Sequence, residues 1–193
     1  AAPPRPAAPP RPSPAPPSAA APAWTPPAAR APDGRAAGVA AREAGFDFLP
    51  HATALTSGQV LADSHAAAAR LGERSDDPVF TLGFCKFGAE SWLLAASDLD
   101  ATGCMGFYGR PGTVQEVVDR LTAPVLILAA GSDQATSPEE NAAFDRALTE
   151  SGKDHEYVIY DGAPHSFFDR SFSDWAPACD DAWGRMLGFI DRN

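Results

Sequence analysis

Short apolar runs alternate along this chain with longer segments of helical character. The clearest run is residues 125–128, Val-Leu-Ile-Leu, which is apolar on both faces, as a central strand of a parallel sheet must be. Strands are predicted at 46–49, 79–84, 104–108, 124–130 and 155–160, helices at 36–44, 59–71, 86–97, 138–151 and 176–190, and apolar positions at helical spacing at 113–121. This alternation predicts an α/β fold, with a mostly parallel sheet and helices on both of its faces.

Local signals mark the limits of several of these elements. Residues 75–78, Ser-Asp-Asp-Pro, predict a turn before the strand at 79–84. Ser137 is a suitable N-cap for the helix at 138–151, and the acidic side chains of Glu139 and Glu140 favour the positive end of its dipole. In the helix at 86–97 we expect the buried side to carry Trp92 and Leu93.

The first 32 residues do not share this pattern. They contain 13 of the 20 prolines, 12 alanines and no Val, Leu, Ile or Phe, so they cannot bury enough apolar surface to offset the entropy of ordering. We therefore expect residues 1–33 to be a disordered Pro/Ala-rich segment and residues 34–193 to form one domain. The Pro-Pro-Arg-Pro sequence also permits a different role for the segment, as a ligand for an SH3-like partner.

Charge and cysteine usage narrow the choice of partners and of compartment. The net charge is −10, which disfavours nucleic acid and anionic membranes as partners, and no apolar stretch approaches the roughly 20 residues of a transmembrane helix. The cysteines at 85, 104 and 179 are widely spaced and contain no CxxC pair. This usage is typical of a reducing compartment, so we expect a cytoplasmic protein without a zinc site or other metal site.

Three chemically reactive side chains each follow a predicted strand. Cys85 comes after the strand at 79–84, Asp133 after the strand at 124–130, and His165 after the strand at 155–160. The carboxyl ends of parallel strands meet at one edge of a sheet, and the order nucleophile, acid, histidine is that of α/β-hydrolases. We therefore expect these three side chains to lie together.

These residue types suit nucleophilic catalysis. A thiol becomes a strong nucleophile when an imidazole takes its proton, and the imidazole needs a carboxylate to fix its tautomer. A Cys-Asp-His triad would form an acyl-enzyme that water then hydrolyses. The alternative is that Cys85 is a small buried hydrophobe, Asp133 a turn residue and His165 a loop residue. The remaining cysteines and histidines are interpreted as structural or exposed: His51, His65, Cys104, His155 and Cys179.

The motifs around these positions resemble those of the dienelactone hydrolase family of α/β-hydrolases over about residues 40–190. They are Gly-Phe-Cys at 83–85, Gly-Phe-Tyr-Gly-Arg-Pro at 106–111, Gly-Ser-Asp at 131–133 and Gly-Ala-Pro-His-Ser-Phe-Phe at 162–168. The resemblance implies hydrolysis of small esters or lactones with no metal or organic cofactor. It makes Cys85 the nucleophile, Asp133 the residue that orients the histidine, and His165 the base.

The chain departs from the family pattern in two places. Phe87 stands where the family has glycine, and its ring is expected to strain or displace the turn at Cys85. The family also has further strands before the helix at 36–44, where this chain has its proline-rich segment, so a partial α/β-hydrolase fold is expected.

These departures affect the expected site and surface. The backbone N–H of Lys86 would be one oxyanion-hole donor, and Arg170 a substitute contact for a substrate carboxylate. A truncated or degenerate relative with little or no catalysis is the alternative to an active hydrolase. An uncovered sheet edge would favour self-association.

Overall fold

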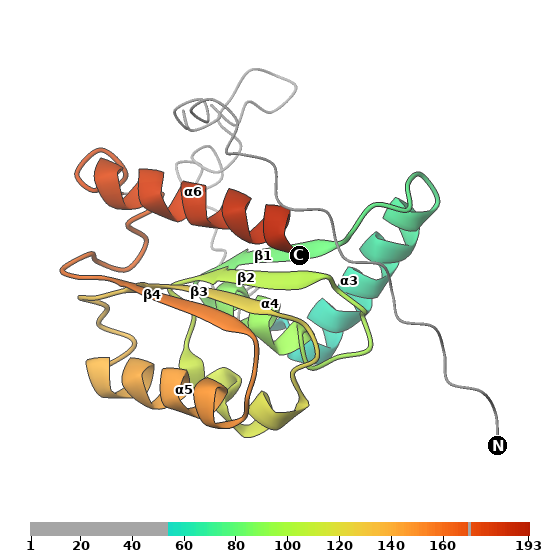
Figure 1. Cartoon of the computed structure of the whole chain (residues 1–193), viewed down its shortest axis with the longest axis horizontal. Helices are drawn as coiled ribbons and strands as arrows, with labels where there is room; N and C mark the ends of the chain where they lie inside the picture. The colour runs from blue at the N-terminus through green and yellow to red at the C-terminus, as the bar shows by residue number, and fades with distance from the viewer. Residues whose placement is uncertain (1–53, 170) are drawn as a thin grey trace, which may run out of the picture.

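The computed structural model describes residues 54–169 and 171–193 (Figure 1). The predicted segment 1–33, the helix at 36–44, the strand at 46–49 and Arg170 lie outside the described residues. The described part contains one sheet of four parallel strands in the order β1-β2-β3-β4. The strands are β1 (Phe80–Phe84), β2 (Gly103–Phe107), β3 (Val125–Ala130) and β4 (His155–Tyr160). The parallel sheet confirms the α/β prediction.

Helices cover both faces of this sheet. Figure 1 shows α6 (Ala176–Arg192) along one face, and α4 (Lys86–Leu94) with α5 (Pro138–Glu150) on the other. Helix α3 (Ser57–Gly72) precedes β1 and lies beside α4. The two 3-10 helices η1 (Pro111–Thr113) and η2 (Gln115–Arg120) connect β2 to β3.

The central strand β3 divides the core into two layers. Its residues Val125, Ile127 and Ala129 pack in the cluster that contains Trp92 of α4 and Phe144 of α5. The alternate residues of β3 pack in the second cluster, which contains the buried face of α6. Because successive side chains of a strand point to opposite faces, an apolar run of this length can supply both clusters.

The region 113–121 forms 3-10 helix where the spacing of its apolar residues is that of an α-helix. The N–H of Val117 donates to the carbonyl of Val114, and the N–H of Leu121 donates to that of Val118, which are i→i+3 bonds. Val114, Val118 and Leu121 are nevertheless buried. The short connection between β2 and β3 therefore buries the apolar side that the spacing predicted, and it does so as 3-10 helix.

The N-terminus of α5 has a second capping hydrogen bond besides the cap at Ser137 that the sequence predicted. Ser137 is its N-cap and accepts a hydrogen bond from the N–H of Glu140. The carboxylate of Glu140 in turn accepts from the N–H of Ser137 at 2.7 Å. This is a capping box, in which two otherwise unsatisfied donors are bonded reciprocally.

Candidate active site

Cys85 lies on a one-residue turn between β1 and α4. Its backbone has φ 55° and ψ −125°, a region that residues with a Cβ rarely adopt, and its N–H donates to the carbonyl of Phe107 at 3.1 Å. Helix α4 begins at the next residue, Lys86. The turn therefore places the thiol at the carboxyl end of the sheet and at the N-terminus of a helix, where the dipole favours a thiolate.

Close contact between α4 and the strands depends on Gly83 and Gly88. A Cβ on Gly83 would lie 1.8 Å from the carbonyl oxygen of Phe87, and one on Gly88 would lie 2.5 Å from that of Phe107. Phe87 is 40% exposed. Phe87 takes part in this contact through its backbone, because its carbonyl oxygen is the atom that a Cβ on Gly83 would meet. The expectation that its ring strains or displaces the turn at Cys85 stays a prediction.

The structure brings Cys85, Asp133 and His165 together. Nε2 of His165 lies 3.0 Å from Sγ of Cys85, and Nδ1 of His165 lies 2.7 Å from Oδ2 of Asp133. The side chain of Asp133 is 3% exposed and that of His165 is 37% exposed. A buried carboxylate, a partly exposed imidazole and a thiol thus form a continuous chain of polar contacts.

Asp133 is held by its own loop. Its Oδ1 accepts a hydrogen bond from the N–H of Ala135 at 2.8 Å, which leaves Oδ2 directed at His165. A carboxylate is an acceptor, so Nδ1 of His165 carries the hydrogen of that contact. Nε2 is then available to accept the proton of the Cys85 thiol, or to donate to the thiolate once the proton has moved.

A cavity of about 380 Å³ opens beside the thiol. Tyr108, directly after β2, packs its ring on His165 with 4.9 Å between the ring centroids, and it has a left-handed backbone with φ 38°. Arg110 is fixed by a hydrogen bond from its Nε to the carbonyl of Ala135. The lining residues are Cys85, Lys86, Ala89, Glu90, Tyr108, Arg110, Thr113, Ala135 and His165.

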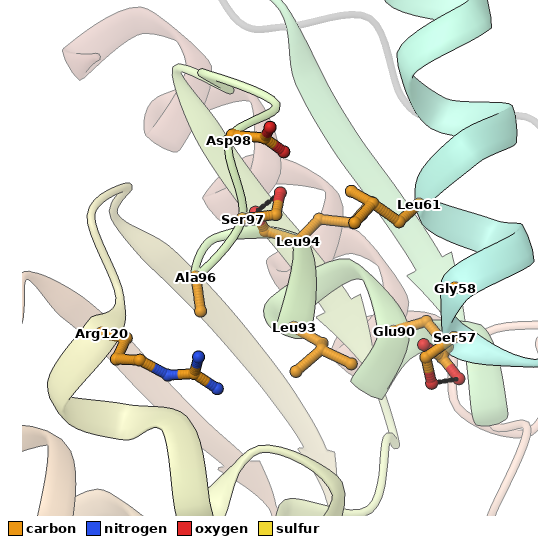
Figure 2. A pocket seen from close by; sticks show the side chains of 10 residues that line it. All are labelled: Ser57, Gly58, Leu61, Glu90, Leu93, Leu94, Ala96, Ser97, Asp98 and Arg120. Carbon is orange, nitrogen blue, oxygen red and sulfur yellow. Dashed lines mark hydrogen bonds between the residues drawn. The ribbon is translucent and has the colours of Figure 1, made fainter.

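Glu90 also lines a second cavity, of about 260 Å³, between α3 and α4 (Figure 2). The residue is buried, and its carboxylate accepts a hydrogen bond from Oγ of Ser57 at 2.9 Å. Figure 2 shows Arg120 on the other side of this cavity. The contact joins the start of α3 to the helix that follows Cys85, so α3 supports one wall of the first cavity.

Four residues of this region were not identified from the sequence: Glu90, Tyr108, Arg110 and Ser166. Tyr108 is the last residue of the strand predicted at 104–108 and Arg110 follows it, so their position at a strand end could have indicated a role. Ser166 directly follows His165 within the motif at 162–168, which could also have indicated a role. Glu90 gave no such signal, because its contact with Ser57 joins distant parts of the chain.

The other predicted site residues have different outcomes. Lys86 is the first residue of α4, so its N–H lies in the first turn near Cys85, while its Nζ donates to the carbonyl of Leu55 at 2.5 Å. Arg170 lies outside the described residues.

Among the described residues, no group of three or more His, Cys, Asp or Glu side chains is arranged to hold a metal ion. None of the described helices has the length and apolar character needed to cross a membrane.

The remaining cysteines and histidines within the described residues lie apart from the three side chains at the cavity. Burial raises the pKa of the Cys104 thiol to about 11, and burial likewise raises the pKa of Cys179 to about 11. His65 contacts Asp98, whose pKa it lowers through a hydrogen bond, and His155 contacts Asp145. Both histidines therefore contact carboxylates other than Asp133.

A parallel sheet with a nucleophile-type residue on a tight strand-to-helix turn defines the α/β-hydrolase class of fold. A family model described as the dienelactone hydrolase family matches residues 35–193. The chain belongs to the dienelactone hydrolase family.

Individual relatives agree with this assignment. A Saccharolobus solfataricus protein with the provisional name carboxymethylenebutenolidase is 32% identical over 141 residues, which are 71% of this chain and 53% of the relative. An Escherichia coli K12 protein with the same provisional name is 29% identical over 146 residues, or 69% of this chain and 54% of the relative. The chain thus spans about half the length of the curated relatives it matches.

Solved structures show the same fold. A provisionally named dienelactone hydrolase from Klebsiella pneumoniae has a TM-score of 0.63 at 25% identity, and the match covers 71% of this chain and 62% of that one. A dienelactone hydrolase-like promiscuous phosphotriesterase from metagenomic libraries has a TM-score of 0.58 at 21% identity, covering 70% and 62%.

Proposed function

We propose that this protein hydrolyses small esters or lactones through a covalent intermediate on Cys85. Membership of the dienelactone hydrolase family supports the substrate class. The observation that carries the proposal is the pair of contacts at His165, 3.0 Å to the Cys85 sulfur and 2.7 Å to the Asp133 carboxylate. These are the contacts that a thiol nucleophile, its base and the residue that orients the base require.

The proposed reaction begins with transfer of the thiol proton from Cys85 to Nε2 of His165. The thiolate attacks the carbonyl carbon of the ester, and the carbonyl oxygen becomes an oxyanion that accepts a hydrogen bond from the backbone N–H of Lys86. The intermediate then collapses, the C–O bond to the alcohol breaks, and the alcohol leaves with the proton of His165. The product of this half-reaction is a thioester on Cys85.

Water completes the cycle. Nε2 of His165 takes a proton from water, whose oxygen attacks the thioester carbon, and the C–S bond breaks to return the thiolate and release the acid. Asp133 remains ionised throughout and stabilises the imidazolium at each stage. No step needs a metal ion or an organic cofactor.

The second candidate function is that of a relative with little or no catalysis. It is favoured by Phe87, which stands two residues after Cys85 at a position where the family pattern has glycine. A tetrahedral oxyanion is normally held by two donors, and loss of one reduces kcat by about 10²–10³-fold. Under this alternative Cys85 would still react with alkylating agents, but ester turnover would be absent.

Hydrolysis of p-nitrophenyl acetate at neutral pH separates the two candidates. The proposal expects turnover by the full chain, a fall of about 10³-fold or more in Cys85→Ala, and near-normal rates in the control Cys104→Ala. The same rate in Cys85→Ala as in the parent would refute a nucleophilic role for this residue. Normal alkylation of Cys85 together with no turnover would favour the degenerate relative.

The proposal extends to the organisation and the setting of the chain. We take residues 34–193 as the hydrolase domain and 1–33 as a separate segment, which is supported by the family match at 35–193. A reducing, cytoplasmic setting is supported by the wide spacing of the cysteines, which contain no CxxC pair.

A further inference from the structure

Ser166, the residue after His165, contacts the sulfur of Cys85. Its Oγ lies 3.9 Å from Sγ, within the range of a long hydrogen bond to sulfur. The residue is 6% exposed, so its hydroxyl needs a partner inside the protein. Within the described part of the chain, the hydrogen-bond partner of this hydroxyl is Cys85.

The backbone at Ser166 is unusual for a residue with a Cβ. Its φ is 65°, in the left-handed region where glycine is the favoured residue. The two residues that follow it, Phe167 and Phe168, are buried in the cluster on the α6 side of the sheet. Their burial holds the chain in this conformation and directs the Ser166 side chain at the thiol.

Other residues with left-handed backbones lie at the same place. The described part of the chain has four non-glycine residues with positive φ. One of them is Cys85 itself, and two others, Tyr108 and Ser166, lie beside its thiol. Tyr108 packs on His165, and Ser166 contacts Cys85. Unfavourable backbone conformations that cluster in this way are typical of functional sites, where the surrounding packing maintains them.

We propose that Ser166 is a positioning residue for Cys85: its hydroxyl donates a hydrogen bond to the thiolate and holds the sulfur within reach of Nε2 of His165. This inference rests on the proposed function, because it assumes that the thiolate is the reactive form. A neutral thiol can donate to the Ser166 oxygen, but a thiolate can only accept from it. The contact therefore changes direction when Cys85 ionises and stabilises the ionised state.

Several charged or titratable groups also face the cavity beside the thiol. Lys86 and Glu90 face the cavity from α4, Tyr108 and Arg110 from the segment after β2, and His165 from the segment after β4. Asp133 acts on the thiol through His165. Because Ser166 carries no charge, its replacement leaves these charges in place, and a change in the ionisation of Cys85 would then report loss of the hydroxyl.

The test measures the rate of carbamidomethylation of Cys85 by iodoacetamide against pH, with peptide mapping to assign the adduct. In both Ser166→Ala and Ser166→Gly we expect the midpoint of the profile to rise by about half a pH unit, as expected for loss of one long hydrogen bond to a thiolate. Ser91→Ala is the matched control. Ser91 is also buried, but its hydroxyl is bonded to Thr81 and not to the thiol. The midpoint of the alkylation profile of Ser91→Ala should therefore equal that of the parent.

The two variants separate the hydroxyl from the backbone. Glycine relieves the left-handed conformation and alanine does not, whereas both remove the hydroxyl. Equal rises in both variants support the inference. An unchanged midpoint in either folded variant, or an equal rise in Ser91→Ala, would overturn it. The readout needs no ester turnover, so an inactive protein would refute the proposed hydrolase without affecting this measurement.

Discussion

In the proposed reaction His165 determines what Cys85 can do, because its two ring nitrogens face chemically different partners. One side is fixed by the Asp133 carboxylate at 2.7 Å, and the other faces the thiol at 3.0 Å. Since the first contact requires a hydrogen on Nδ1, the proton of the thiol can move only to Nε2. The hydrogen-bonding pattern of one residue thus defines the direction of proton transfer.

Replacement of Asp133 tests this dependence. In Asp133→Asn the amide can donate to Nδ1 and favour the tautomer with its hydrogen on Nε2, which cannot accept the thiol proton. We expect ester turnover to fall by about 10³–10⁴-fold, measured as kcat with p-nitrophenyl acetate.

Asp145→Asn is the matched control for that variant. Asp145 also bonds a histidine, His155, at 3.1 Å, but this pair lies away from the cavity that contains Cys85. Its turnover should remain within about twofold of the parent's, as expected for a surface change. Equal losses in the two variants would mean that the effect of Asp133 is not specific.

Thiol reactivity distinguishes Cys85 from the other cysteines. Burial raises the pKa of both Cys104 and Cys179 to about 11, so at pH 7.5 their thiolate fraction is negligible. We expect iodoacetamide to add one adduct to the folded protein, at Cys85, and three after unfolding in urea. Intact-mass measurement counts the adducts, and comparable labelling of all three cysteines before unfolding would contradict the expectation.

At the scale of elements, the fit between α4 and β2 controls the position of Cys85. A Cβ on Gly88 would meet the carbonyl oxygen of Phe107 at 2.5 Å, and this backbone atom cannot move independently. Gly88→Ala should therefore displace the start of α4, with a loss of about 1–3 kcal/mol in the free energy of unfolding and a marked loss of ester turnover.

Urea denaturation and kinetics of this variant are best compared with those of Gly112→Ala. A Cβ at Gly112 would meet nothing within 4 Å, and this variant should keep the parent's turnover and stability within about 0.5 kcal/mol. If Gly88→Ala is as stable and as active as Gly112→Ala, the close packing of α4 is not what positions the thiol.

The elements that bury apolar runs are those that the sequence predicted well. The strand at 124–130 contains β3, because burial on both faces requires uninterrupted apolar residues. The strand at 155–160 has the bounds of β4, although most residues of β4 are only partly buried. The helix predicted at 86–97 ends as α4 at Leu94, and that predicted at 59–71 begins as α3 at Ser57, since helix ends depend on local hydrogen bonds.

In the candidate site, too, some contacts could be predicted from the sequence and others could not. The meeting of Cys85, Asp133 and His165 could be predicted, because each follows a parallel strand and the carboxyl ends of such strands share one edge. The contact of Ser166 with Cys85 could not, since it depends on a left-handed backbone that no residue type in the sequence indicated.

At the scale of the whole molecule, buried thiol and phenol groups make the free energy of unfolding fall at alkaline pH. The thiols of Cys104 and Cys179 have a pKa near 11, and burial also raises the pKa of Tyr157 and Tyr160. The folded state holds these protons more tightly than the unfolded state does. This stabilisation is complete below the unfolded values, about 9 for the thiols, and is lost as the pH rises through the folded ones.

We expect the free energy of unfolding in urea to be constant from pH 7 to 8.5 and to fall by several kcal/mol by pH 11. In Cys104→Ala the fall should be smaller by roughly 2 kcal/mol, since one pKa unit corresponds to about 1.4 kcal/mol. The same fall in this variant as in the parent would show that the buried thiol does not contribute.

The edge of the sheet at β1 has consequences for assembly. Among the described strands β1 pairs only with β2, and Leu82 on β1 is 44% exposed. An edge of this kind favours pairing with another chain. We expect the full chain to self-associate in sedimentation velocity, and Leu82→Lys to reduce this association.

An exposed leucine elsewhere provides the control for edge pairing. Leu71 near the end of α3 is also exposed, and Leu71→Lys should leave the sedimentation profile unchanged if β1 is responsible. A parent protein that sediments as a single monomeric species at all concentrations would contradict association through this edge.

The covalent intermediate is the central claim, and trapping it is the most direct test. Turnover of p-nitrophenyl acetate is stopped with acid before the steady state, and the protein is analysed by intact mass and peptide mapping. The account predicts one acetyl group, on Cys85, in the parent and none in Cys85→Ala. Ester hydrolysis at the parent's rate without acetyl on Cys85, or with the acetyl group on another residue, would contradict it.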